Sequence, residues 1–279
     1  MKTYCKFDLY TKNTMRLHCI AEKVYEPETI DELKELVVML KDSGETYHLL
    51  GAGSNVILPN SLSSPVILLT SVSNDILIDK NTVECGCSVR IQKLIRECQR
   101  KELGGLEYLY SVPCNVGGAV YMNAGAGRNQ ISDYIERIEY YSPTKGTVEF
   151  IEKSNADFSY RHSIFQQNDW IILRIRFSLP SATYSEVEDR VKSRIKFANE
   201  KQAGNLPSCG SVFSQCNGHI MQLLMGLRIG GACWSKKTRN WISNLGGAKS
   251  KDICRLIGIA RFLHIITLQK YSVEVRIWK

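Results

Sequence analysis

Two side chains in separate motifs could take part in proton transfer or anion binding, and a third charged residue, Glu274, stands in an alternating segment. Ser211 stands in CGSVF between a glycine and an apolar pair, so its hydroxyl would either begin a strand or face a pocket and hand over a proton. Arg161 in SYRHS could clamp an anion or form a surface ion pair. Glu274 in SVEVRIW would share one strand face with Arg276, with the apolar residues on the other face, which is also typical of a solvated face with a weak ion pair. The motifs alone leave both interpretations open for Ser211 and Arg161, and for Glu274 they indicate only the solvated face.

Two glycine-rich segments could bring the backbone close to a ligand. The first, GAGSNV at residues 51–56, has Val56 where a dinucleotide-binding fingerprint needs its third glycine and opens no helix, which excludes that fingerprint. Its N–H groups could form an anion nest, or the segment could be a simple tight turn. The second, NVGGAVYMNAGAG at residues 115–127, places glycines among apolar residues. We expect backbone lying against a flat ligand there, with Asn123 as a polar contact.

Hydrolase and metal chemistry find no support in the motifs. CGSVF is not the Gly-x-Ser-x-Gly nucleophile elbow, which argues against a hydrolase. The 10 cysteines are scattered through apolar segments, and only Cys85 and Cys87 form a tight pair. A zinc site normally needs a second pair at suitable spacing, so no metal site is expected. We interpret the cysteines as reduced thiols that pack like small apolar side chains.

The charge distribution favours a small anionic ligand. The chain has 279 residues, 44% of them hydrophobic and 23% charged, a composition typical of an ordinary globular protein. Its net charge of +8 is uneven, with +10 on residues 181–279 and −2 on residues 1–180. The basic residues are spread out and aromatics do not alternate with them, so a phosphorylated small molecule fits better than nucleic acid. No stretch could cross a bilayer and none is typical of a signal peptide, so we expect a cytoplasmic protein with no membrane partner.

Periodicity predicts helices and strands in both halves of the chain. Thr29 and Glu32 form a predicted capping box for the first helix, and Gly44 ends it. The predicted helices cover residues 29–43, 90–103, 185–202 and about 250–268. A hairpin is expected with its turn at residues 79–81, and a single strand at residues 272–278. This mixture indicates an α+β fold.

Taken together, these motifs resemble the UDP-N-acetylenolpyruvoylglucosamine reductase (MurB) family over nearly the whole chain. The matching pieces follow the family's order. They are NT at 13–14, LLGAGSNVIL, GLEYLYSVPCNVGGAVYMNAGAG, FSYRHSIF, KQAGNLPSCGSVF, GLRIGGA, NLGGAKSKD and EVRIW.

The resemblance implies a flavoprotein with a vanillyl-alcohol-oxidase-type fold. An FAD-binding region would cover residues 1–180, with subdomains of about 1–72 and 73–180, and an α/β substrate-binding domain would cover residues 181–279. The implied FAD contacts lie in two segments, 51–55 and 113–127. They are Gly51, Ala52, Gly53, Ser54, Asn55, Pro113, Asn115, Gly117, Gly118, Asn123, Ala124 and Gly125.

The same resemblance implies the reaction and the roles of the three side chains. NADPH-linked, FAD-dependent reduction of UDP-N-acetylglucosamine enolpyruvate would give UDP-N-acetylmuramate, a peptidoglycan precursor, in a monomeric enzyme. Ser211 would be the general acid, Arg161 would pair with the substrate carboxylate, and Glu274 would polarise that carboxylate or hold the serine network. Further implied substrate contacts are Tyr160, Ser214 and Gln215.

The sequence departs from the family pattern near the expected substrate and flavin sites. Ser214-Gln215-Cys216 replaces Lys-Asn-Pro, Gln222 takes a usual acidic position, and NAGAGRNQ replaces NAGAYGGE. Two alternatives therefore stay open. One is a homologous flavin reductase for a different enolpyruvyl sugar nucleotide or anionic substrate, such as a surface polysaccharide precursor. The other is a flavin-binding paralogue that does not turn over.

Overall fold

The computed structural model describes all 279 residues. Contacts divide the chain into two compact units, each built from segments that are distant in sequence. The first unit contains Met1–Tyr4, Val24–Ala52 and Ser64–Lys196, and the second contains Cys5–Lys23, Gly53–Ser63 and Phe197–Lys279. The predicted boundary at residue 181 separates a flavin-binding region from a substrate-binding domain. A division by contacts does not test which residues bind which ligand, so this boundary stays a prediction.

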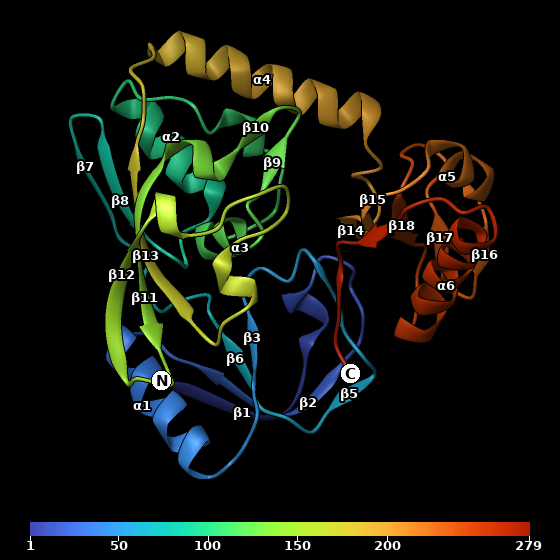
Figure 1. The fold of residues 1–279 in the computed structure, drawn as a ribbon, viewed down its shortest axis with the longest axis horizontal. Coiled ribbons are helices and arrows are strands. Elements are labelled where there is room, and N and C mark those ends of the chain that lie inside the picture. Colours follow the sequence, from blue (N-terminus) through green and yellow to red (C-terminus); the bar gives the residue numbers. More distant parts are fainter. The chain divides into compact units, whose positions relative to one another are not determined.

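An antiparallel sheet forms the largest layer of the first unit (Figure 1). Its strands run in the order β12 (Thr147–Glu152), β11 (Ile135–Ser142), β13 (Ile171–Ser178), β8 (Thr82–Gly86) and β7 (Ile76–Asp79). The predicted hairpin is confirmed, because β7 and β8 pair from Ile76–Cys85 to Asp79–Thr82. Lys80 in its turn has a φ of 52°, the left-handed conformation that such tight turns use.

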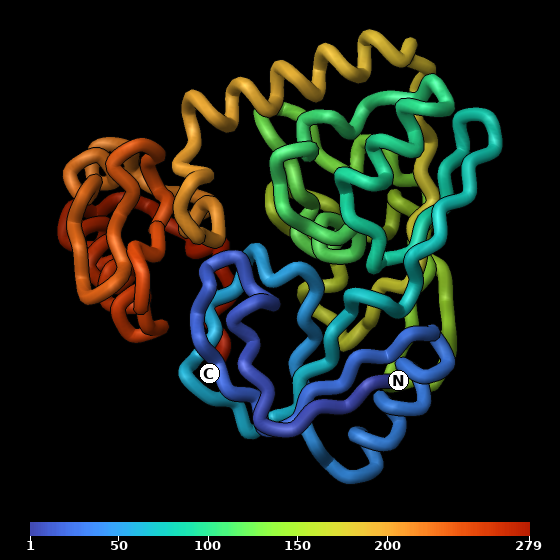
Figure 2. Tube along the Cα trace, turned by 180° about the vertical axis from the view of Figure 1, so that it is seen from behind, coloured from blue at the N-terminus to red at the C-terminus, as the bar shows by residue number.

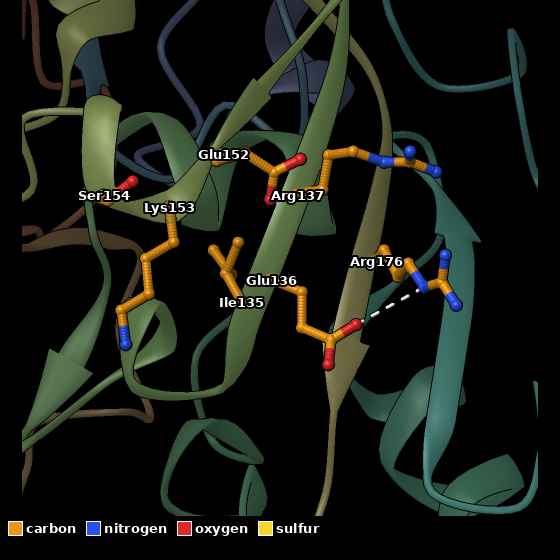
Figure 3. A pocket seen from close by; sticks show the side chains of 7 residues that line it. All are labelled: Ile135, Glu136, Arg137, Glu152, Lys153, Ser154 and Arg176. Carbon is orange, nitrogen blue, oxygen red and sulfur yellow. Dashed lines mark ion pairs between the residues drawn. The ribbon is translucent and has the colours of Figure 1, made fainter.

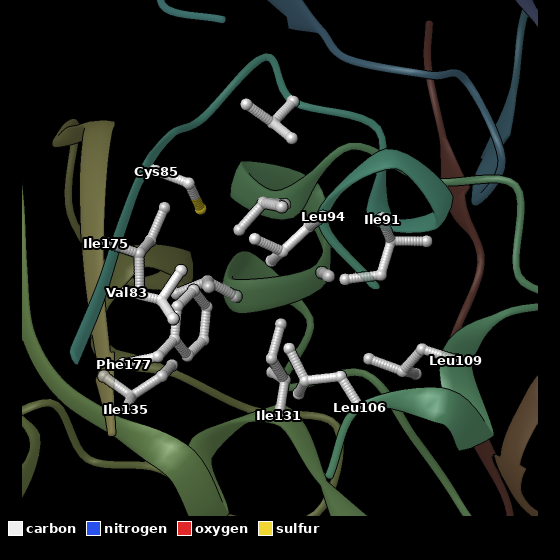
Figure 4. Packing of buried hydrophobic residues seen from close by; sticks show 14 of the residues in the cluster. Val83, Cys85, Ile91, Leu94, Leu106, Leu109, Ile131, Ile135, Ile175 and Phe177 are labelled. Atoms are coloured by element: carbon white, nitrogen blue, oxygen red, sulfur yellow. The ribbon is translucent and has the colours of Figure 1, made fainter. Parts of the chain in front are cut away.

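The core of the first unit lies on one face of this sheet, under α2 (Ile91–Arg100) and α3 (Val116–Tyr121) (Figure 4). Burial alternates along β13, where Ile175 and Phe177 are buried while Arg176 is partly exposed. This period of two is what a sheet with one covered face requires. Apolar residues of α4 (Tyr184–Lys201) complete the cluster.

A second sheet contains β6, which pairs in parallel with β2 and β3, and accompanies α1 (Ile30–Asp42). Val66 of β6 pairs with Val24 on one side and His48 on the other. The strand order is β1 (Lys2–Asp8), β2 (Ile20–Glu26), β6 (Val66–Leu68) and β3 (His48–Leu50). Figures 1 and 2 both show the N-terminus beside α1, and its ammonium group contacts Glu32.

The predicted helix start at Thr29 is confirmed, but only half of the capping box forms. The Thr29 hydroxyl accepts a hydrogen bond from the N–H of Glu32 at 3.1 Å. The Glu32 carboxylate instead accepts from the N–H of Glu28, one residue before the cap. The N-terminal ammonium group pairs with the same carboxylate. This partner of Glu32 is distant in sequence, so the local capping-box pattern could not predict it.

The second unit contains an antiparallel four-stranded sheet packed on helices. The strand order is β14 (Ser208–Ser211), β18 (Trp241–Asn244), β17 (Ala232–Trp234) and β16 (Arg228–Ile229). The helices are α5 (Gly218–Leu224) and α6 (Ser250–Ile266). Trp234 is buried at the centre of this core, where its ring stacks on Phe213 with 6.3 Å between centroids. The predicted helix from Ser250 is confirmed.

Short strands complete the chain. They are β4 (Val56–Ile57), β5 (Ser61–Leu62), β9 (Gly125–Ala126), β10 (Asn129–Gln130), β15 (Phe213–Gln215), β19 (Ser272–Val273) and β20 (Arg276–Ile277).

The prediction of one continuous C-terminal strand is wrong. The segment forms two strands with different partners, since β19 pairs with β15 and β20 pairs with β4. Between them the N–H groups of Glu274 and Val275 both donate to the carbonyl oxygen of Val212, at 2.8 and 3.3 Å. Consecutive N–H groups of a regular strand point to opposite sides, so this shared acceptor requires a break in the strand. The simple alternation of faces is lost, and Ile277 is exposed.

Phe177→Ala should test the core of the first unit. We expect a loss of about 3–5 kcal/mol in the free energy of unfolding, because Phe177 is fully buried and its removal leaves a cavity. The matched change Leu77→Ala, at a side chain 59% exposed, should cost less than about 0.5 kcal/mol. Urea unfolding followed by circular dichroism measures both, and equal losses would contradict the core assignment.

Candidate active site

Ser211 and Glu274 lie on neighbouring segments of the second unit, joined through the backbone of Val212. The carbonyl oxygen of Val212 accepts from the N–H of Glu274 at 2.8 Å, and its N–H donates to the carbonyl oxygen of Asn240 at 2.9 Å. Ser211 is the preceding residue and pairs with Trp241 of β18. Both Ser211 and Glu274 are partly exposed. The fold therefore holds the backbones of Ser211 and Glu274 at one common residue, Val212.

The residues around Ser211 explain the order Gly-Ser-Val-Phe. Gly210 has a φ of +75°, a conformation that favours glycine, and the pairing of β14 with β18 is irregular between Ser208 and Ser211. Val212 and Phe213 are both buried. The apolar pair thus fixes the chain in the core while Ser211 stays accessible at its edge.

Cys209 is the thiol nearest to Ser211 along the chain, and burial makes it unreactive. Burial, with a smaller contribution from the charge of Glu274, raises the pKa of the Cys209 thiol to about 12. A thiolate is the nucleophilic form of cysteine, so Cys209 is not suited to covalent catalysis near neutral pH.

The glycine loop after β3 uses Gly53 for packing within the second unit. Gly53 has a φ of +64°, and a Cβ there would lie 2.2 Å from the carbonyl oxygen of Lys12. The N–H of Thr14 donates to the carbonyl oxygen of Gly53 at 3.0 Å. Asn55 then bonds through its Nδ2 to the carbonyl oxygen of Glu274 at 3.4 Å. The close backbone approach expected at Gly53 is thus made by the chain's own backbone.

Residues of the first unit fit the predicted flat cofactor. Asn115 is buried; its Nδ2 donates to the carbonyl oxygen of Leu69 at 3.3 Å, while its Oδ1 has no hydrogen-bond partner within the chain. An unsatisfied buried acceptor is costly, and a ligand donor would satisfy it. A Cβ at Gly51 or Gly118 would meet no atom within 4 Å, so the backbone borders open space at both glycines. These three residues could therefore hold part of an FAD molecule.

Other predicted cofactor residues support the fold of this segment. A Cβ at Gly117 would meet Cys87 at 2.8 Å, and one at Gly125 would meet the carbonyl oxygen of Asn129 at 2.3 Å. Asn123 is buried with a φ of 43°; its Nδ2 donates to Gln130 and to the carbonyl oxygen of Ser159, at 2.6 and 2.8 Å. The Asn123 amide is thus occupied by contacts within the chain. Its role toward FAD stays a prediction, as do those of Ala52, Ser54, Pro113 and Ala124.

Arg161 lies in a tight turn of the first unit. Its φ is 59°, and the turn closes through the pairing of Ser159 with His162. Nη2 of its guanidinium donates to the carbonyl oxygen of Gly125 at 3.1 Å. The guanidinium carbon Cζ lies over the Tyr160 ring, 5.3 Å from the ring centroid. Tyr160 itself is 63% exposed. A left-handed non-glycine residue with an oriented guanidinium fits the predicted anion clamp.

The segment that departs from the family pattern is well anchored. Ser214 lies on β15, and its hydroxyl donates to the carbonyl oxygen of Ser272 at 3.4 Å. Gln215 pairs with the same residue. Gln222 on α5 accepts from Nε of Arg239 at 2.6 Å. These replacements thus carry polar contacts of their own.

Sequence reasoning missed two polar residues that hold this region. Asn240 bonds to the backbone of Val212 and Phe213. His264 is buried on α6, where its Nε2 accepts from the N–H of Asn217 at 2.9 Å. Their bonds cross 27 and 47 residues of sequence, so no local pattern could have indicated them.

Figure 3 shows a pocket of about 530 Å³ that contains none of the predicted site residues. It is lined by Ile135, Glu136, Arg137, Glu152, Lys153, Ser154 and Arg176. Two of its charged side chains pair with each other, since Nε of Arg176 lies 3.3 Å from a carboxylate oxygen of Glu136. No group of three or more His, Cys, Asp or Glu side chains is placed to hold a metal ion. No helix combines the length and apolar character needed to span a bilayer.

Comparison with known proteins defines the class of the fold. Residues 21–151 match a family model described as an FAD binding domain. A solvent-stable cholesterol oxidase shares the fold with a TM-score of 0.51 and 15% identity, covering 64% of this chain and 38% of that chain. The predicted α+β, FAD-binding fold is confirmed.

Two further matches define the family. A UDP-N-acetylenolpyruvoylglucosamine reductase from Pseudothermotoga lettingae is 34% identical over 240 residues, which cover 82% of this chain and 83% of the relative. The crystal structure of the enzyme of that name from Thermus caldophilus matches with a TM-score of 0.80 and 26% identity, covering 100% of this chain and 98% of that chain. The chain belongs to the UDP-N-acetylenolpyruvoylglucosamine reductase family, as its motifs predicted.

Gly53→Ala should separate packing from flexibility in the glycine loop. We expect a loss of at least about 2 kcal/mol, because the new methyl group would meet the Lys12 carbonyl oxygen in addition to the strain of a positive φ. Gly247→Ala is the matched control, since Gly247 has a φ of +66° and open space around it. It should cost only the strain, about 1 kcal/mol. Thermal unfolding measures the difference, and equal losses would contradict the close approach.

Thiol labelling should follow burial rather than proximity to the site. Cys5 is exposed and should react with iodoacetamide at pH 8. Cys209 and Cys114 should remain unlabelled until the protein unfolds, because burial raises the pKa of each thiol to about 12. Peptide mass spectrometry reads each site. Labelling of folded Cys209 at a rate close to that of Cys5 would show that its strand is open.

Proposed function

We propose that this protein reduces the enolpyruvyl group of UDP-N-acetylglucosamine enolpyruvate to give UDP-N-acetylmuramate, with FAD as cofactor and NADPH as reductant. Membership of the family carries the proposal. The backbone contact that brings the segments of Ser211 and Glu274 together at Val212 supports it, because the reaction needs a proton donor and a polarising group in one site.

FAD, when bound, supplies the hydride that adds to the terminal carbon of the enolpyruvyl double bond. Asn115, Gly51 and Gly118 would hold it through an unsatisfied acceptor and open backbone. The other residues predicted in the two glycine segments would shape the same site.

Ser211 donates the proton that completes the addition. Hydride arrival leaves negative charge on the carbon next to the carboxylate, and one proton at that carbon gives the saturated lactyl ether. A serine hydroxyl is a weak acid, so it must be held close to a strongly basic carbon. The buried pair Val212–Phe213 provides this rigidity, since neither residue can move without exposing the core.

Arg161 and Glu274 act on the substrate carboxylate. The Arg161 guanidinium binds the carboxylate and the charge that develops beside it. Its bond to the carbonyl oxygen of Gly125 orients it before substrate arrives. Glu274 polarises the carboxylate or holds the serine network. Tyr160, Ser214 and Gln215 contact the rest of the substrate.

The charge of the chain suits this substrate. Residues 181–279 carry +10, and a nucleotide diphosphate sugar with a carboxylate is strongly anionic. We infer a cytoplasmic location because nucleotide sugars and NADPH are used inside the cell. A monomeric state and the lack of nucleic-acid and membrane partners stay predictions from the sequence.

A related substrate is the second candidate. Gln222 is bonded to Arg239, and Ser214 to the chain at Ser272, where the family pattern has charged residues. A reductase for another enolpyruvyl sugar nucleotide would retain Ser211, Arg161 and Glu274. It would differ from the family pattern at the residues that contact the rest of the substrate, as this chain does at Ser214 and Gln222. NADPH oxidation measured with each enolpyruvyl sugar separates the two. A flavin spectrum with no turnover on any of them would indicate the paralogue that only binds flavin.

Ser211→Ala should separate the two half-reactions. We expect flavin reduction by NADPH to continue, while reoxidation of the flavin by the sugar substrate slows about 10²- to 10⁴-fold, the usual contribution of a general acid. Stopped-flow absorbance of the flavin follows each half-reaction. Ser61→Ala, the same change at an exposed serine on β5 of the same unit, should alter neither rate more than about twofold. Sugar reduction near the wild-type rate in Ser211→Ala would overturn the acid assignment.

A further inference from the structure

Asn240 forms three hydrogen bonds with the two residues that follow Ser211. Its carbonyl oxygen accepts from the N–H of Val212 at 2.9 Å. Its side chain forms two more bonds, because Oδ1 accepts from the N–H of Phe213 at 2.9 Å and Nδ2 donates to the carbonyl oxygen of Phe213 at 2.7 Å. One residue thus satisfies three backbone groups of a two-residue segment.

The chemistry of asparagine suits this position. Its amide offers a donor and an acceptor side by side, so it pairs with Phe213 as a neighbouring strand would. Asn240 has a φ of +63°, a conformation that asparagine tolerates better than most side chains. β18 begins at the next residue, Trp241, which pairs with Ser211. Asn240 therefore stands where two kinds of contact meet: its side chain bonds to Phe213, and the next residue pairs with Ser211 as part of β18.

Glu274 contacts the same segment through the backbone of Val212. The carbonyl oxygen of Val212 accepts from the N–H groups of Glu274 and Val275 at 2.8 and 3.3 Å. Asn240 and Glu274, from two distant parts of the chain, thus both bond to this two-residue segment. A shift of Phe213 would be passed along the chain to Ser211, whereas Glu274 keeps its own bond to Val212.

We infer that Asn240 is a positioning residue for proton transfer, whose amide fixes the backbone between Ser211 and Glu274. This inference rests on the proposed function of Ser211. Asn240 acts through backbone hydrogen bonds, so its contribution is the placement of the Ser211 hydroxyl and not any contact with the substrate.

Two substitutions divide the contacts of Asn240. Asn240→Gly keeps the positive φ and the backbone bond to Val212 but removes both side-chain bonds to Phe213. Asn240→Asp keeps the acceptor for the Phe213 N–H and loses the donor to its carbonyl oxygen. Leu268→Gly is the control for relief of a left-handed residue in the same unit, because Leu268 has a φ of 54° and is 92% exposed.

Amide hydrogen exchange, read residue by residue by NMR, tests the contacts without any substrate. In Asn240→Gly the Phe213 amide should exchange at least about tenfold faster, while the Val212 amide stays protected by the retained backbone bond. In Asn240→Asp the Phe213 amide should stay protected. Leu268→Gly should change neither amide. Unchanged exchange at Phe213 in Asn240→Gly would overturn the inference at its structural step.

Stopped-flow kinetics test the consequence for the reaction. Asn240→Gly should slow reoxidation of the flavin by the sugar about 10- to 100-fold, the cost of a small misplacement, and leave reduction by NADPH within about twofold. In the Ser211→Ala background the same change should have no further effect above about twofold, because Asn240 acts only through Ser211. A purely structural role would slow both half-reactions, or add to the loss in that background, and either result would overturn the inference.

The two proposals can fail separately. If Ser211→Ala retains sugar reduction, the acid assignment is lost, and with it the role of Asn240 in proton transfer. If Ser211→Ala blocks sugar reduction while Asn240→Gly changes exchange at Phe213 but not the rate, the proposed function stands and only the positioning role is overturned.

Discussion

The hydrogen bonds of the Val212 backbone are the interaction on which the candidate active site depends. Its N–H and carbonyl groups bond to two segments that are distant in sequence, which carry Asn240 and Glu274, while its side chain is buried. A buried backbone group that loses its partner is costly, so the bonds to Asn240 and to Glu274 each stabilise this arrangement. These bonds hold the backbones of two partly exposed residues, Ser211 and Glu274, close to each other. A weak acid such as serine can serve only under that condition.

Glycine serves two separate purposes in the segments that the sequence marked. Gly53, Gly117 and Gly125 are required by the chain's own packing, because a Cβ at each would meet other atoms at 2.8 Å or less. Gly51 and Gly118 border open space instead, near the end of β3 and within α3. Glycine thus allows close packing of the chain at the first three positions, and at the other two it leaves the backbone accessible to a flat ligand. The unsatisfied acceptor of Asn115 adds the polar feature that distinguishes such a site from a void.

Much of the fold could be predicted from local pattern. The helix that begins after Thr29 and the hairpin at Lys80 follow from capping and turn chemistry, which act over a few residues. The C-terminal segment could not be predicted in this way, since its alternation is that of one strand. A contact with Val212, distant in sequence, breaks it in two. Non-local hydrogen bonds decide such cases, and no periodicity reports them.

The sequence by itself determined the family, the FAD-binding fold and the residue types available for proton donation and anion binding, because ordered motifs and local propensities are written along the chain. Tertiary structure alone decided which of these residues meet. It placed Glu274 on the residue that follows Ser211, tied Asn55 to Glu274, and gave Asn240 three contacts with a segment 27 residues away. The reason is physical: buried polar groups must find partners, and which partners lie within reach is settled only when distant segments pack together.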